Sequence, residues 1–141
     1  MKTPTPISIS RYLAFVLGIF IPLAETIRRW STWQNDPPSF FDDFFIGGFL
    51  LLGAWLVTKN PWRGQRYLTS AFGFMCGMVY PSFFGQLEAI RMGEVDPAPI
   101  SSTSVAIVKG VGFALAIAGL LLSLKKLPER DIGAAFNGSG D

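Results

Sequence analysis

Five ionisable side chains lie within or beside long apolar segments of this chain, where a charge needs a partner or a function. They are Glu25, Asp42, Asp43, Glu88 and Lys109. A charge that faces lipid at mid-bilayer costs at least about 2.5–3.5 kcal/mol, so such groups turn inward, pair with one another or mark a path for ions and protons. Lys109 is expected to lie roughly 8–12 Å below the outer end of its helix. Its expected counter-charges are Glu25, Asp43 and Glu88.

The composition excludes several other kinds of chemistry. The chain has no histidine, which excludes imidazole acid–base catalysis and imidazole metal ligands within it. A single cysteine, Cys76, excludes an internal disulfide. Adjacent Asp42 and Asp43 match neither a metal-binding motif nor a spaced acid–base pair. The net charge of +2 includes no basic run typical of a nucleic-acid surface. We therefore expect no metal, no cofactor and no nucleic-acid partner, and an enzyme is the least favoured class of function.

Four apolar segments must hold the ionisable residues in place. Charged residues make up only 16% of the chain, against roughly 25% in soluble domains. Each segment approaches the roughly 17–25 residues that a helix needs to cross a bilayer, and the segments cover about residues 12–29, 40–57, 67–87 and 104–124. The first lacks a following cleavage motif, so we expect a span rather than a signal peptide. The predicted fold is an all-α integral membrane four-helix bundle over residues 1–127, with a disordered tail over 128–141.

The distribution of basic residues predicts the orientation of the bundle, because Lys and Arg are enriched in cytoplasmic loops. Eight bases flank the side that carries both termini, namely Lys2, Arg11, Lys59, Arg63, Arg66, Lys125, Lys126 and Arg130. Only three flank the other side, namely Arg28, Arg29 and Arg91. Both termini are therefore predicted to be cytoplasmic, and the size and topology suggest a bacterial inner membrane. Aromatic anchors agree, with Trp30 and Trp33 expected at the outer interface and Tyr12, Trp62 and Tyr67 at the inner one.

Small residues recur at helical spacing in every segment and predict where helices approach closely. The expected packing residues are Gly18, Gly47, Gly73, Gly77, Gly112, Ala116 and Gly119. Gly73 and Gly77 form a G-x-x-x-G motif. Pro22 and Pro81 each remove one helical hydrogen bond and are expected to kink their helices.

Three classes of function are compatible with these features. The favoured class is a non-catalytic accessory, assembly or scaffold subunit that packs through its small-residue helix faces against a membrane-protein partner or copies of itself. The alternative is a small transporter or channel with an outward-facing polar cavity, whose lining residues are Lys109, Glu25, Asp43 and Glu88. A membrane enzyme acting through Asp42, Asp43 and Glu88 has the weakest support. The lipid bilayer is the partner common to all three.

Overall fold

The computed structural model contains four helices, and it describes residues 5–31, 34, 37–96 and 98–125. The helices are α1 (Pro6–Arg29), α2 (Pro37–Lys59), α3 (Pro61–Arg91) and α4 (Ser102–Ser123). No strand occurs among the described residues, so the predicted all-α fold is confirmed. The predicted disordered tail over 128–141 and the anchor Trp33 lie outside the described residues.

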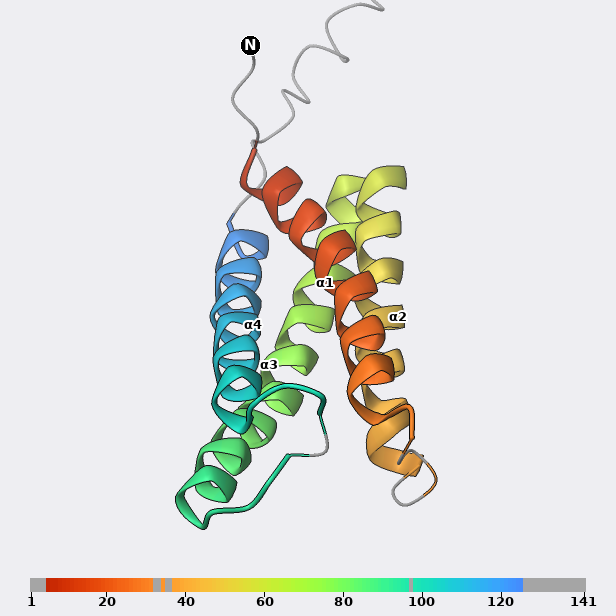
Figure 1. Cartoon of the computed structure of the whole chain (residues 1–141). Helices are drawn as coiled ribbons and strands as arrows, with labels where there is room; N and C mark the ends of the chain where they lie inside the picture. The colour runs from red at the N-terminus through yellow and green to blue at the C-terminus, as the bar shows by residue number, and fades with distance from the viewer. Residues whose placement is uncertain (1–4, 32–33, 35–36, 97, 126–141) are drawn as a thin grey trace, which may run out of the picture.

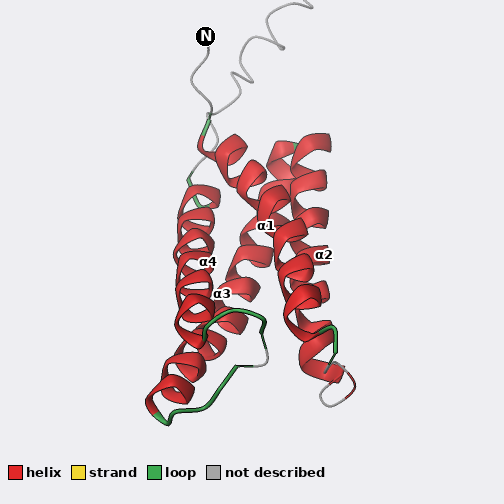
Figure 2. Ribbon diagram, in the orientation of Figure 1, coloured by secondary structure: helices red, strands yellow, loops and turns green. Residues whose placement is uncertain are grey.

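The helices form an up-and-down bundle (Figures 1 and 2). Each helix packs against its neighbour in the sequence, and α4 packs against α1 to close the ring. Both α1 and α3 run toward one end of the bundle, while α2 and α4 run back. We call the end that holds the α1–α2 and α3–α4 connections the outer end, and the end that holds the α2–α3 turn the inner end. This naming follows the orientation predicted above.

Proline and capping residues set the helix boundaries, which extend a few residues beyond the predicted apolar segments. Pro6 opens α1, Pro37 opens α2, and Pro61 opens α3. Proline suits the first turn of a helix because the N–H it lacks has no partner there. Helix α3 ends before Gly93, whose φ of +76° lies in the left-handed region. Glycine adopts that conformation without strain and so terminates helices readily.

Three of the helices are long and apolar enough to cross a membrane. They are Pro6–Arg29, Phe40–Lys59 within α2, and Ser102–Ser123. Helix α3 has 31 residues but a lower mean hydropathy, because glycine, tyrosine and polar residues dilute its aliphatic content. Its connections lie at opposite ends of the bundle. If α2 and α4 span the bilayer, α3 must therefore cross it as well, and that crossing remains a prediction.

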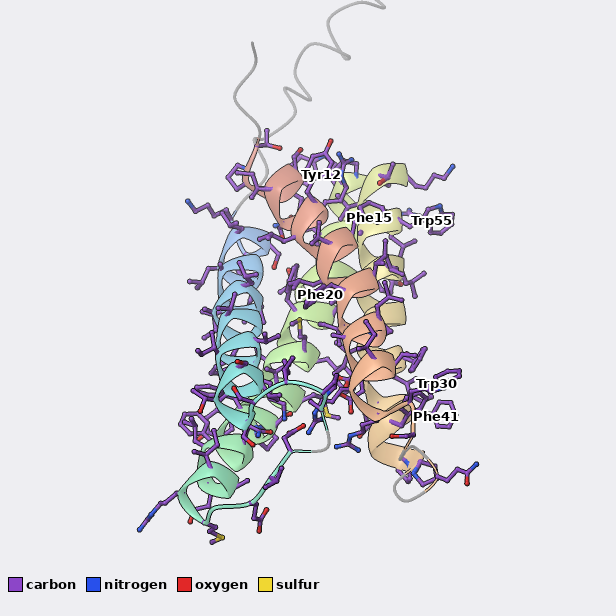
Figure 3. All side chains as sticks on the ribbon, in the orientation of Figure 1. Tyr12, Phe15, Phe20, Trp30, Phe41 and Trp55 are labelled. Carbon is purple, nitrogen blue, oxygen red and sulfur yellow. The ribbon has the colours of Figure 1, made fainter. Side chains whose placement is uncertain are left out.

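The outer surface of the bundle is rich in large apolar side chains. Phe45 is 71% exposed, Ile107 62% and Leu121 59%. Figure 3 shows Trp30, Phe41 and Trp55 projecting away from the helices. Apolar surface on this scale is unusual for a soluble monomer and is typical of a face covered by lipid or a partner. The surface therefore supports a membrane-embedded bundle.

Several small residues on α1, α2 and α4 make close interhelical contacts. A Cβ added at Gly47 of α2 would lie 2.6 Å from the carbonyl oxygen of Gly18 on α1. A Cβ added at Gly119 of α4 would overlap the buried ring of Phe72 on α3. Ala116 is fully buried in the same core. These contacts allow the backbones to approach as closely as helices in lipid require.

The two glycines of the G-x-x-x-G motif in α3 differ from this expectation because they lie on the outside of the bundle. A Cβ at Gly73 or Gly77 would meet nothing within 4 Å, and the same is true of Gly112 on α4. Ser70 and Pro81 on the same face of α3 are also exposed. The opposite face of α3 carries the large side chains that fill the core, namely Leu68, Phe72 and Met75.

Both interior prolines lie within continuous helices, Pro22 in α1 and Pro81 in α3. The Pro22 ring packs where α1 crosses α2, since its Cγ would lie 2.5 Å from a Cβ added at Gly47. Thr26 donates a hydrogen bond of 2.7 Å to the Pro22 carbonyl oxygen. Pro22 is thus part of the α1–α2 contact. The helix kinks expected at Pro22 and Pro81 stay predictions.

Candidate functional site: a polar network at the outer end

The last turns of α1 carry the centre of a buried polar network. Glu25 is only 7% exposed. Nη1 of Arg28 donates hydrogen bonds of 3.2 Å to both carboxylate oxygens of Glu25. Its Oε1 also lies 2.6 Å from Nε of Arg29. The two arginines follow Glu25 at the three- and four-residue spacings that place side chains on one helix face. One acid is thus shared by two bases of the same helix.

Asp96, in the connection between α3 and α4, is the second acid of the network. Arg28 donates to both of its oxygens, from Nε to Oδ1 at 3.1 Å and from Nη2 to Oδ2 at 2.8 Å. Such a two-pronged guanidinium–carboxylate pair is strong and geometrically specific. The Ala98 backbone N–H also donates to Oδ1 at 2.9 Å. Arg28 therefore connects α1 with the α3–α4 connection.

The surroundings of Asp96 keep its carboxylate ionised. Its side chain is only 3% exposed, and burial alone would raise the pKa of Asp96. Hydrogen bonds from Arg28 and the Ala98 N–H outweigh this effect, and they hold the pKa of Asp96 below its ordinary value of 3.8. The Asp96 backbone N–H donates to Ser102 Oγ at 3.1 Å, which joins the start of α4 to the same point.

Lys109 extends the network across α3 and α4. Its Nζ donates to Oε1 of Gln86 at 3.1 Å and to the carbonyl oxygen of Ser82 at 3.3 Å. Gln86 is 6% exposed, and its side chain helps to lower the pKa of the nearby Asp96 carboxyl. The Gln86 amide therefore accepts a hydrogen bond from the ammonium group of α4 and lies near the acid that Arg28 holds. Among the described residues, Lys109 has neutral oxygens rather than carboxylates as its hydrogen-bond acceptors.

The network is balanced in charge and touches every helix. Asp43 of α2 interacts electrostatically with Glu25, Lys109 and the two arginines of α1. The acids are Glu25, Asp43 and Asp96, and the bases are Arg28, Arg29 and Lys109. Among the described residues, the Arg28–Asp96 ion pair joins α1 to the α3–α4 connection, and the hydrogen bonds of Lys109 join α4 to α3.

The structure brings together three of the five predicted polar residues, Glu25, Asp43 and Lys109. Glu88 lies elsewhere: its side chain is 51% exposed, and its Oε2 lies 3.6 Å from Nη1 of Arg91. The physical reason is that Glu88 shares the outward face of α3 with Gly77 and Pro81. Asp42, beside Asp43, is half-buried. Within the described residues, no group of three or more metal-ligating side chains is present.

Sequence reasoning missed Asp96 and Gln86 as members of the network. In the sequence Asp96 precedes a proline, and an Asp-Pro pair favours a turn. This pair is the sequence signal that could have indicated an ordered connection at Asp96. Comparison of the chain with family models, curated proteins and solved structures found no match. A function for this chain is therefore inferred from its contacts and surfaces.

Proposed function

We propose that this protein is a non-catalytic accessory, assembly or scaffold subunit of a cell membrane, and that it docks another transmembrane helix on the outward face of α3. One observation supports the proposal most strongly. The G-x-x-x-G motif of α3 faces away from the bundle, and a Cβ at Gly73 or Gly77 would meet nothing within 4 Å. The motif thus plays no part in packing this chain's own helices.

Such a face suits a second helix better than it suits lipid. Small residues let two backbones approach closely, and van der Waals packing is a main source of helix association in a bilayer. Exposed aromatic side chains flank the glycines, with Tyr80 55% exposed and Phe84 46% exposed. A helix face of glycines beside exposed aromatic rings lets the ridge of a neighbouring helix approach closely. The occupant is either a second copy of this chain or another membrane protein.

The proposed setting is a bacterial inner membrane with both termini in the cytoplasm. Support comes from the described bases of the inner end, which include Lys59, Arg63 and Arg66. The described acids of the network all lie at the opposite end. This arrangement agrees with the enrichment of Lys and Arg in cytoplasmic loops.

Substituting leucine for both Gly73 and Gly77 is expected to weaken the association by about tenfold or more. Overpacking a close contact costs about 1–3 kcal/mol, and each ~1.4 kcal/mol is a factor of ten. The matched control is Gly48→Leu, because Gly48 on α2 also has nothing within 4 Å. Co-purification in mild detergent is the measurement. Recovery of the wild-type protein as a lone monomer would overturn the proposal.

A small transporter or channel is the second candidate, favoured by the burial of Glu25 beside Asp43 and Lys109. In that case Lys109 holds an anionic group, or a carboxylate carries a proton across the outer half of the bundle. Lys109→Met is then expected to abolish substrate-driven charge or pH movement in proteoliposomes while the protein stays folded. The absence of flux in wild-type protein across a broad substrate panel counts against this candidate.

A further inference from the structure

A hollow at the inner end of the bundle lies apart from both the polar network and the glycine face of α3. It has a volume of about 410 Å³ and is lined by Lys59, Asn60, Pro61, Trp62 and Arg63, at the turn between α2 and α3. Ligand-binding clefts typically have volumes of about 300–1,000 Å³. Two of the lining residues are cations, and both are exposed.

The polar groups of this turn divide into those already paired and those available to a ligand. Oδ1 of Asn60 accepts hydrogen bonds from the backbone N–H groups of Trp62 and Arg63, at 3.1 and 3.3 Å. The first N–H groups of α3 are therefore occupied by this cap. Lys59 and Arg63 remain as the groups that a ligand would meet, and both attract anions.

The electrostatic setting strengthens this preference. The described residues at the inner end include five bases and no acid, and the bases are Arg11, Lys59, Arg63, Arg66 and Lys125. Lys125 is held at this end because Gln65 donates to its carbonyl oxygen at 2.8 Å. Bases near a membrane surface attract anionic lipid.

Aromatic side chains place the hollow at the depth of lipid headgroups. Trp55 is 51% exposed, Trp62 46% and Tyr67 52%, and Trp and Tyr are enriched where the hydrocarbon meets the headgroups. The ammonium group of Lys59 lies 5.8 Å from the centre of the Trp55 ring. That cation–π contact holds the lysine beside the interface.

We propose that the hollow at the α2–α3 turn binds the phosphate of an anionic phospholipid headgroup, with Lys59 and Arg63 as the phosphate ligands. A guanidinium and an ammonium group suit a phosphate, because the guanidinium donates two parallel hydrogen bonds and the ammonium adds a compact charge. The aromatic side chains contact the glycerol and the upper acyl chains. This site is separate from the glycine face of α3. Lipid binding here and helix docking there can therefore fail independently of each other.

The experiment measures the binding of phosphatidylglycerol to the full chain in mild detergent by native mass spectrometry. R63Q is expected to weaken binding about 5-fold, and the double variant K59Q/R63Q about 30-fold. The matched control is R91Q, which removes the same charge from an exposed arginine at the outer end and is expected to bind as the wild type does. Thermal melting of each variant confirms that the fold is intact.

Two further arms identify the source of the phosphate. Phosphatidylcholine, which has the phosphate but no net charge, is expected to bind at least tenfold more weakly than phosphatidylglycerol. Inorganic phosphate is expected not to displace the lipid. If inorganic phosphate binds as tightly as the lipid, the site belongs to a soluble anion and the proposal is overturned. Equal binding by wild type and K59Q/R63Q overturns it as well.

Discussion

Replacing Arg28 by methionine is expected to lower the free energy of unfolding by about 3–5 kcal/mol, the usual cost of removing one partner from a buried ion pair. Arg28 is the base that contacts both Glu25 and Asp96. Its loss leaves the Asp96 carboxylate, which is only 3% exposed in the wild type, without its ion-pair partner. Arg29 still pairs with Glu25, so most of the loss falls on Asp96. Unfolding in mild detergent under a titration with SDS measures the change.

The matched control for this prediction is Arg91→Met, at the exposed pair with Glu88. The side chains of that pair are 81% and 51% exposed, and exposed pairs contribute about 0–1 kcal/mol. Adding Asp96→Leu to Arg28→Met removes the unpaired acid, so the double variant is expected to be more stable than Arg28→Met alone. Equal stability losses for Arg28→Met and Arg91→Met would show that the network does not hold the outer end together.

Gly47→Ala is expected to destabilise the bundle by about 1–3 kcal/mol, as overpacking of a close contact does. The added Cβ would lie 2.6 Å from the Gly18 carbonyl oxygen and 2.5 Å from Cγ of Pro22. A backbone carbonyl and a proline ring cannot rotate away, so α1 and α2 must separate. The same SDS titration measures the loss.

The neighbouring residue Gly48 provides the control, because a Cβ there meets nothing within 4 Å. Alanine is favoured over glycine inside a helix by roughly 0.5–1 kcal/mol. Gly48→Ala is therefore expected to leave the bundle as stable as the wild type or slightly more stable. A Gly47→Ala protein as stable as Gly48→Ala would contradict the close crossing of α1 and α2.

The helices and part of the packing could be predicted from the sequence, because apolar segment length and small-residue spacing reflect requirements of any helix bundle in lipid. Gly18, Gly47 and Gly119 pack as expected for this reason. Gly73 and Gly77 share the same spacing but lie outside the bundle. Spacing shows that a helix face permits close approach without showing which helix approaches. Lipid and protein core are both apolar, so hydropathy does not distinguish the two faces of α3.

The polar network could be predicted only in part for a different reason. Glu25 and Arg28 lie on one helix, where their spacing alone indicates a pair. Asp96 belongs to a connection without helical periodicity, and its position depends on the tertiary contact with Arg28. Gln86 is uncharged and gives no signal in a survey of charges, although it accepts a hydrogen bond from Lys109. Long-range partners in loops are therefore the part that sequence patterns leave open.

Cysteine cross-linking in native membranes tests whether the outward glycine face of α3 contacts another transmembrane helix. Gly77→Cys is made together with Cys76→Ala, which removes the single native cysteine. The matched control places the cysteine at Gly48 in the same background. We expect an oxidant-dependent or crosslinker-dependent adduct for Gly77→Cys, with a second copy or a distinct partner, and none for Gly48→Cys. Monomer alone at Gly77→Cys, or equal adducts at both positions, would contradict it.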